Sequence, residues 1–433
     1  MIKHKNIISF CLIVLPNLAL FYVSLWLTIH WWYPAGLNRA DLAAHFEHFS
    51  VIFVLWLITF LSFRLFEREP FRRYTTLFFG LGSASLVNLA LGIGYFYFQP
   101  ALILTPRRFL LVLVGLSFLF ILIWDLILKL FVFNRFVQSV YLYSFDDELK
   151  HLQIEIAKHD YLGFKVVGHI TDEELPGLPA GSLVIFPDHL HQDPRLTNSI
   201  FRLRKNAIAF FNHNDFYESL LRRVYIPSLD QIWFLQNITY SRNIFYWLVK
   251  SFFDYLVVII VFLVFVLTYP FVAIGIKLSS AGPVIFRQLR VGIDGQNFTI
   301  YKYRTMVGES SNKWTAVGDA RITRFGKFLR LARLDELPQS LNLLQGNMSL
   351  VGPRPEQVGI VEDLKKAIPF YEERHTVKPG LTGWAQLNVY AGSLEESKLK
   401  LEYDLYYLKN QSLLLDLEII VKTIYNVVFL RGQ

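Results

Sequence analysis

Two adjacent carboxylates, Asp335 and Glu336, are the residues of this sequence with the clearest capacity for chemistry. Pro338 follows them closely, and the segment continues to Gly346. Proline suits the first turn of a helix and glycine commonly follows a helix end, so the pair is expected at the N-terminus of a helix that Gly346 terminates. Acidic residues in that place usually do no more than stabilise the helix end.

Basic residues gather in the sequence around this pair and give it a second interpretation. They are Lys302, Arg304, Arg321, Arg324, Lys327, Arg330, Arg333 and Arg354. The guanidinium group offers a bidentate fork to phosphate oxygens, so the cluster suits a phosphate ligand, although part of it could equally face anionic lipid. Beside a phosphate, an ionised Asp335 can attack phosphorus while Glu336 helps to hold a Mg²⁺ ion that screens the repulsion between the two anions.

Two loops rich in glycine and proline follow, at residues 349–355 and 377–386. Pro353 and Pro355 flank Arg354, restrict its backbone and would aim the guanidinium at a low entropic cost. The second loop contains no residue with an obvious chemical role, and turn formation alone would explain it.

An apolar run from Phe252 to Ile276 precedes this chemistry and is long enough to cross a membrane. Pro270 interrupts the helical hydrogen-bond pattern, and both flanks are basic, which favours a helix broken at Tyr269–Pro270 that enters the membrane and returns on the same side. A proline-kinked spanning helix is the alternative. Asp254 is costly in a membrane unless paired, and Lys250, one turn earlier, is a suitable partner.

Four further apolar runs occupy the first third of the chain, and each approaches the roughly 20 residues that span a hydrocarbon core. They are Ile7 to His30, Phe49 to Phe66, Thr75 to Phe98 and Phe109 to Phe133. The first is too long, and too soon followed by another, for a cleaved signal peptide. Basic residues place the N-terminus and the loop after the second span in the cytoplasm, although Arg107 and Arg108 argue for the opposite orientation.

Composition agrees with a membrane protein, because 53% of the 433 residues are hydrophobic and only 18% are charged. These values exclude a disordered chain and a nucleic-acid-binding arm. The single cysteine, Cys11, excludes a disulfide framework and a thiolate zinc site within one chain. The formal net charge of +8 fits a membrane-facing surface or a phosphate-rich ligand.

The middle of the chain, from Ser139 to Pro227, alternates short apolar runs with amphipathic segments, which predicts a parallel sheet of βαβ units. Its expected strands are Val140 to Tyr143, Phe164 to Ile170, Ser182 to Phe186 and Ala207 to Phe211. The turn after the first strand has no glycine and carries Asp146 and Asp147 where a pyrophosphate would sit. A regulatory, scaffolding or oligomerising domain is therefore favoured over dinucleotide binding.

Several ordered motifs together resemble the bacterial sugar transferase family, the polyprenyl-phosphate hexose-1-phosphate transferases. They are Lys302 to Met306, Asp319 to Gly326, Leu334 to Gln339, Met348 to Pro355 and Pro379 to Gln386. The resemblance covers roughly Arg242 to the C-terminus. The order of four membrane helices, a Rossmann-like domain and the transferase is similar to the large members that make undecaprenyl-diphosphate glucose or galactose.

The resemblance implies an enzyme that uses a UDP-sugar, undecaprenyl phosphate and Mg²⁺ in the bacterial inner membrane, with its catalytic domain in the cytoplasm. Asp335 would be the nucleophile that forms a phosphosugar intermediate, Glu336 would support the metal, and Arg330 and Arg354 would contact phosphate. The re-entrant helix, at about 248–278, also belongs to this family. Glucose is the first expectation for the sugar and galactose the second, and a homo-oligomer is compatible with the resemblance.

Three positions depart from the family pattern. Tyr269 replaces a common serine before the proline, which puts a hydroxyl bond at the bend in doubt. Arg333 replaces a small polar residue, and Asn347 stands where an aspartate is usual.

The expected fold is membrane α plus α/β. It combines a four-helix transmembrane bundle (1–133), a Rossmann-like parallel-sheet domain (134–236) and a mainly helical catalytic domain anchored by the re-entrant helix (237–433). A catalytically silent scaffold or regulator of polysaccharide assembly and a transporter are the competing functions. The lipid bilayer is an expected partner and nucleic acid is not.

Overall fold

A computed structural model describes most of the chain and divides it into two compact units, Met1–Leu220 and Leu221–Gln433. The residues described are 2–63, 65–66, 74–97, 107–133, 137–144, 146–159, 162–192, 200–201, 208–238, 244–308, 319–389 and 393–428. Several residues that bear on the orientation of the spans lie outside these ranges: Arg64, Arg68, Arg72, Arg73, Asn134 and Arg135. Arg242, at the start of the region that resembles the family, also lies outside them. The boundaries expected at 133 and 236 remain predictions.

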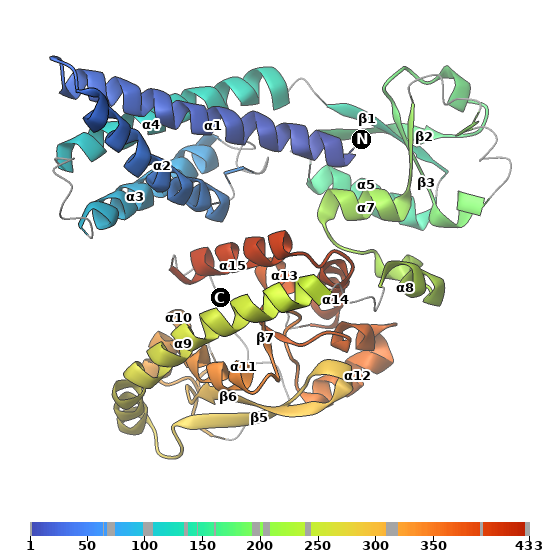
Figure 1. Ribbon diagram of the computed structural model, residues 1–433. Helices are drawn as coiled ribbons and strands as arrows, with labels where there is room; N and C mark the ends of the chain where they lie inside the picture. The colour runs from blue at the N-terminus through green and yellow to red at the C-terminus, as the bar shows by residue number, and fades with distance from the viewer. Residues whose placement is uncertain are drawn as a thin grey trace. The chain divides into compact units, whose positions relative to one another are not determined.

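The first unit begins with four long apolar helices, as the hydropathy pattern predicts (Figure 1). They are α1 (Ile2–Trp32), α2 (Arg39–Ser62), α3 (Tyr74–Tyr97) and α4 (Arg107–Ile127), which a π-helical turn η2 (Leu128–Phe133) extends. Helix α2 starts ten positions before the expected Phe49, because the Asn38 side chain caps it by accepting the Asp41 backbone N–H at 2.8 Å. Each of the four has the length and hydropathy of a membrane span. Contacts join α1 to α2 and α4, and α3 to α2 and α4.

A four-stranded parallel sheet follows in the same unit, in the strand order β2-β1-β3-β4. The strands are β1 (Gln138–Tyr143), β2 (Phe164–Ile170), β3 (Leu183–Phe186) and β4 (Ala209–Asn212). The helices are α5 (Asp147–Lys158) and α7 (His213–Leu221), which contact each other through the His151 and Tyr217 rings. This confirms the predicted parallel sheet and its four strands.

The second unit is mainly helical and contains two small sheets (Figure 1). Its helices are α8 (Gln231–Asn237), α9 (Ile244–Ser279), α10 (Arg324–Leu331), α11 (Ser340–Leu344), α12 (Val358–Ala367), α13 (Trp384–Asn388), α14 (Leu394–Lys409) and α15 (Leu413–Val428), and its strands are β5 (Ile285–Val291), β6 (Asn297–Tyr303), β7 (Ser349–Val351) and β8 (Gly380–Thr382). Strands β5 and β6 form an antiparallel hairpin, and β7 pairs with β8 in parallel. Val224 and Ile226 belong to a core of this unit, together with Ile360.

Helix α9 continues through Pro270, so the break expected at Tyr269–Pro270 does not interrupt the helix. Thr268 lies one position before Tyr269, the residue that replaces the serine common in the family. The Thr268 hydroxyl donates a hydrogen bond to the carbonyl oxygen of Val264 at 2.7 Å. Pro270 has no N–H to donate, and the carbonyl that would accept it in a helix is that of Val266, two positions after the carbonyl that Thr268 binds. The Tyr269 ring instead lies against Phe265, with 5.7 Å between the ring centroids.

Candidate active site

Asp335 and Glu336 lie in the first turn of a helical segment, as predicted. This turn is the 3₁₀ helix η9 (Leu334–Gln339), which continues into α11. Arg333 precedes it in the left-handed conformation with φ 55°, and Gly346, with φ 76°, follows the segment. The tight 3₁₀ turn includes Pro338, and η9 contacts strand β6, from which Lys302 reaches Glu336.

The Glu336 carboxylate is the point where three elements meet. Its Oε1 accepts hydrogen bonds from Lys302 Nζ at 2.9 Å and from Arg354 Nη2 at 2.8 Å. Lys302 comes from β6 and Arg354 from the loop after β7, so the two predicted phosphate-binding residues converge on the predicted acidic pair. Burial alone would raise the pKa of Glu336, but Lys302 and Arg354 outweigh it and hold this pKa well below its usual range.

The Asp335 carboxyl has the opposite tendency. Burial, followed by the negative charge of Glu336, raises its pKa, and this rise is only partly offset by Lys302, Arg330 and Arg333. Two neighbouring carboxyl groups with pKa values moved apart are characteristic of catalytic acidic pairs. When it is ionised, Asp335 is therefore the more basic of the two carboxylates.

The other predicted basic residues differ in their placement. Arg330 Nε donates to Thr305 Oγ1 at 2.9 Å, and its charge acts on Asp335. Arg304 Nη2 donates instead to the carbonyl oxygen of Ser280 at 2.7 Å, at the end of α9. Arg321 pairs with Asp319 at 2.7 Å. The hydrogen bonds of Arg304 and Arg321 thus go to groups other than the acidic pair.

The Asp319 to Gly326 motif positions Arg330. Thr323 caps α10 by accepting the Gly326 N–H at 2.9 Å, and a Cβ atom at Gly326 would lie 2.1 Å from the Thr305 carbonyl oxygen. Only glycine allows α10 to approach Thr305 closely enough for the bond from Arg330.

The second glycine-rich loop acquires a role in the structure that its residue types did not suggest. A Cβ atom at Gly380 would lie 2.1 Å from the Gly352 backbone nitrogen, and one at Gly383 would lie 2.2 Å from the Gly352 carbonyl oxygen. The loops at 349–355 and 377–386 are therefore in direct backbone contact, which fixes the start of the loop that carries Arg354.

A buried ion pair that the sequence did not reveal supports Arg354 from behind. Arg374 is 1% exposed, and its Nη2 lies 2.7 Å from Asp404 Oδ2 and 3.0 Å from the Arg354 carbonyl oxygen. Arg374 thus holds the backbone of Arg354 while Glu336 holds its guanidinium.

Glu356, just after this loop, is the centre of a second unpredicted set of charges. It pairs with Lys400 and lies 3.6 Å from Arg290 Nη1, which also donates to the Pro355 carbonyl oxygen at 3.0 Å. Burial would raise the pKa of Glu356, but Lys400 and Arg374 lower it to about 2. The sequence hints at these buried charges only through the charged residues that stand among apolar ones in α14 and near residue 374.

Asp254 and Lys250 do not pair with each other, so the expected i,i+4 pair is wrong. Asp254 accepts a hydrogen bond from Ser349 Oγ, and Lys250 Nζ binds Asp416 Oδ2 at 2.9 Å and the Val351 carbonyl oxygen at 3.1 Å. Both therefore tie the first half of α9 to β7 and α15, beside a small cavity that they line. Burial against the globular unit, rather than a neighbour on the helix, supplies their partners.

The donor set at Asp335 and Glu336 fits Mg²⁺. This ion takes oxygen ligands and commonly binds one or two carboxylates together with phosphate oxygens of a substrate. Among the described residues, the group of three His, Asp or Glu side chains close enough to hold a metal lies elsewhere, at Glu148, Asp188 and His213. A metal at the acidic pair would thus need ligands from the substrate.

The second half of the chain is similar to known proteins. Residues 245–430 match the family model described as bacterial sugar transferase. A UDP-N-acetylgalactosamine-undecaprenyl-phosphate N-acetylgalactosaminephosphotransferase of Aeromonas hydrophila is 48% identical over 159 residues, which are 36% of this chain and 38% of that protein. A UDP-glucose:undecaprenyl-phosphate glucose-1-phosphate transferase of Xanthomonas campestris pv. campestris is 47% identical over 36% of this chain and 34% of that protein.

The aligned part of the chain thus spans little more than a third of those two relatives. A shorter protein of Bacillus subtilis, named as the uncharacterized sugar transferase EpsL, is 42% identical over 162 residues, which are 36% of this chain and 76% of that protein. The residues that match the family model include Asp335, Glu336, Lys302 and Arg354. Because the chain covers 76% of a sugar transferase to which it is 42% identical, it belongs to the bacterial sugar transferase family.

Proposed function

We propose that this protein transfers hexose-1-phosphate from a UDP-sugar to undecaprenyl phosphate, releasing UMP and forming undecaprenyl-diphosphate-sugar. This would be the first membrane step of exopolysaccharide, capsule or O-antigen synthesis. The observation that carries the proposal is the convergence of Lys302 and Arg354 on Glu336, beside the buried Asp335. Relatives whose names specify undecaprenyl phosphate as the acceptor support it.

The transfer would proceed in two displacements at phosphorus. The Asp335 carboxylate attacks the β-phosphorus of the UDP-sugar, the bond from that phosphorus to the bridging oxygen breaks, and UMP leaves with the bond's electron pair. A phosphate oxygen of undecaprenyl phosphate then attacks the phosphorus of the phosphosugar on Asp335. The carboxylate leaves unchanged, and the sugar diphosphate remains on the lipid.

The surrounding cations would bind and orient the diphosphate for this reaction. Arg354 and Lys302 are held at fixed positions by Glu336, so little side-chain entropy is lost when they meet a phosphate. Arg330 is fixed through Thr305 on the side of Asp335. Asp335 and Glu336 would hold Mg²⁺, whose positive charge would lower the repulsion between the carboxylate and the anionic donor.

A re-entrant position for α9 is part of the proposal. Val258, in its first half, belongs to a core with Leu343 and Ile419, whereas Val272 and Ile276, in its second half, belong to a core with Leu329. Both halves therefore pack on one globular unit. A helix that crossed the bilayer would place these two halves, and the protein that covers them, at different depths.

Topology can be tested with one introduced cysteine. Gln296 is exposed in the β5–β6 hairpin that follows α9, and Cys11 can be changed to serine to remove the native thiol. With α9 re-entrant and the catalytic domain cytoplasmic, an impermeant thiol reagent should label Gln296→Cys only after the inner membrane is opened. Labelling in intact spheroplasts would refute this topology.

The sugar is proposed as glucose first and galactose second, and one relative is named for N-acetylgalactosamine. The four N-terminal helices would anchor the chain in the bacterial inner membrane as a transmembrane bundle. The sheet domain would act in regulation, scaffolding or assembly of a homo-oligomer.

The activity test uses the purified full-length chain with undecaprenyl phosphate, Mg²⁺ and each of UDP-glucose, UDP-galactose and UDP-N-acetylgalactosamine. We expect release of UMP with at least one donor, ping-pong kinetics and a labelled phosphosugar on Asp335. Asp335→Asn should abolish all three, whereas Asp363→Asn on an exposed face of α12 should not. UMP release that survives Asp335→Asn would refute the mechanism, and no release with any donor would favour a silent scaffold.

A further inference from the structure

Three side chains capable of binding a metal meet at the carboxyl edge of the four-stranded sheet, far along the sequence from Asp335. Glu148 lies in the first turn of α5 after β1, Asp188 begins the 3₁₀ helix η5 (Asp188–Gln192) after β3, and His213 opens α7 directly after β4. The strands are parallel, so all three follow carboxyl ends at one edge of the sheet. Open α/β sheets bind ligands at this edge, at the point where the strand order reverses.

That reversal lies between β1 and β3, since the order is β2-β1-β3-β4. Glu148 and Asp188 follow the two strands that flank it, and His213 follows the next strand. A dinucleotide is not favoured there because the turn carries carboxylates in place of glycine. The same carboxylates suit a cation.

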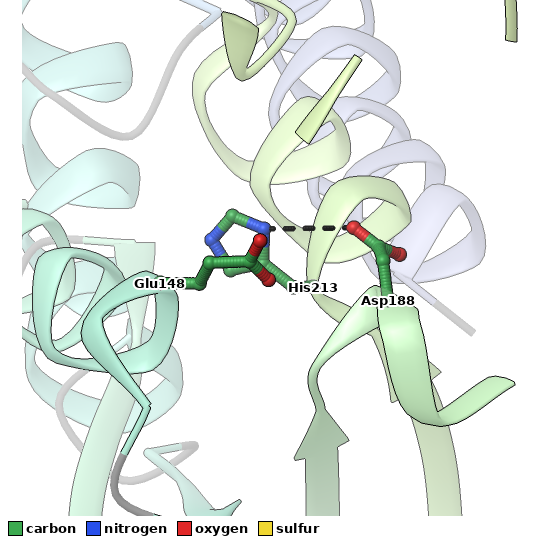
Figure 2. Close-up of side chains that lie close together, drawn as sticks. All are labelled: Glu148, Asp188 and His213. Atoms are coloured by element: carbon green, nitrogen blue, oxygen red, sulfur yellow. Dashed lines mark ion pairs between the residues drawn. The ribbon is translucent and has the colours of Figure 1, made fainter. Parts of the chain in front are cut away.

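The geometry is compact enough for one ion. One ligand atom from each of the three side chains lies within 4.8 Å of the others, and the side chains point toward one another (Figure 2). His213 Nδ1 is 3.9 Å from Asp188 Oδ2. His213 is fully buried, whereas the Asp188 side chain is 21% exposed, which leaves a route for an ion from solvent.

The two carboxylates are only partly compensated within the part of the chain that the structure describes, where a backbone hydrogen bond from Asn214 reaches Asp188. Glu148 Oε2 and Asp188 Oδ2 are both buried there without a hydrogen-bond partner, and neither carboxylate has an ion pair with a described lysine or arginine. Burying unpaired carboxylates close together is costly. A bound divalent cation would remove both the repulsion and the unsatisfied oxygens.

We propose that Glu148, Asp188 and His213 form a binding site for a divalent transition-metal ion, which fastens the ends of β1, β3 and β4 together. Two carboxylate oxygens and one imidazole nitrogen are a mixed ligand set that suits ions such as Zn²⁺, Mn²⁺ and Fe²⁺ better than Mg²⁺ or Ca²⁺. Three protein ligands leave a position for water or for a ligand of the domain.

A proton is the competing occupant. Burial and then the charge of Glu148 raise the pKa of Asp188 to about 7, so binding should be measured at pH 8, where the proton competes less.

The experiment uses the tag-free, full-length chain in detergent, stripped with EDTA and dialysed against Zn²⁺ at pH 8. Asp335→Asn is present in every sample, so that the catalytic pair contributes equally. Bound zinc is measured by mass spectrometry, and Tm is recorded with and without Zn²⁺. His189→Gln is the matched control, because His189 is 61% exposed at the same edge and pairs with Asp146 outside the triad.

We expect the parent chain and His189→Gln to bind one zinc ion more than His213→Gln. Asp188→Asn and Glu148→Gln should weaken binding at least tenfold and abolish the rise in Tm caused by Zn²⁺. Because each removes a repelling charge, neither should lower the Tm of the metal-free chain. Equal zinc uptake by parent and triad variants, an equal loss in His189→Gln, or a lower metal-free Tm in both carboxyl variants would overturn the proposal.

Discussion

Glu336 is the best single position at which to test the proposed active site, because one of its oxygens accepts both Lys302 and Arg354. Glu336→Gln keeps the size and one acceptor oxygen but removes the charge. Lys302 and Arg354 are then held less firmly, because their acceptor is neutral. We expect a slower reaction from a protein that still folds.

The size of the loss follows from the two bonds, at 2.9 and 2.8 Å. A hydrogen bond to a charged group contributes about 1.5–3 kcal/mol, and a neutral acceptor retains roughly half of this. The two bonds together would lose about 1.5–3 kcal/mol. At about 1.4 kcal/mol for each factor of ten, kcat/KM should fall roughly 10- to 150-fold if this alignment is needed in the transition state.

The assay measures initial rates of UMP release with the preferred UDP-sugar and undecaprenyl phosphate, together with Tm as a control for folding. Glu372→Gln provides the matched control, because Glu372 is 65% exposed and pairs with Lys365 away from the site. Its rate should stay within twofold of the parent. A Glu336→Gln enzyme with the kcat/KM of the parent would refute the reasoning that this carboxylate aligns the two cations.

Three further outcomes are expected. Because the pKa of Asp335 is raised and its ionised form attacks, the loss of activity on acidification should begin at a pH above the ordinary carboxyl pKa of about 3.9. Glu336→Gln removes the nearby negative charge and should move this acidic limb of the pH–rate profile to lower pH. A limb that does not move would contradict this expectation. Arg374→Met leaves Asp404 buried and unpaired and should destabilise the protein by about 3–5 kcal/mol in denaturant unfolding; a stability equal to the parent would contradict the ion pair's role. Gly380→Ala would put a Cβ atom 2.1 Å from the Gly352 nitrogen, so kcat should fall even if the Tm shows that the protein is folded. An unchanged kcat would show that catalysis does not need the contact between the two loops.

Local patterns in the sequence were sufficient for the elements and for part of the site. Continuous apolar runs predicted the long helices α1 to α4 and α9, and short runs of β-branched and aromatic residues predicted the parallel sheet. Pro338 and Gly346 predicted the helical segment at Asp335 and Glu336. These features depend on residues close in sequence, where spacing determines the structure.

Long-range partners could not be predicted in the same way. Arg374 contacts the Arg354 backbone across twenty positions, and Lys250 reaches Asp416 across 166. Neither pair has a periodic signature, because each is created by tertiary contact between distant elements. The partners of Arg304 and Arg321 were not predictable either, since their bonds go to Ser280 and Asp319, and phosphate binding by these two residues stays a prediction.

The resting site is also electrically balanced, which bears on the expected metal. Glu336 is held ionised, and with an ionised Asp335 it matches the charges of Lys302 and Arg354. A UDP-sugar brings two further negative charges, and these exceed what the four side chains can neutralise. Arg330 and Arg333, whose charges also act on Asp335, can offset part of this excess. A divalent cation that enters with the diphosphate would supply the remaining positive charge, and Mg²⁺ stays part of the proposal because the two carboxylates offer the oxygen ligands that it prefers.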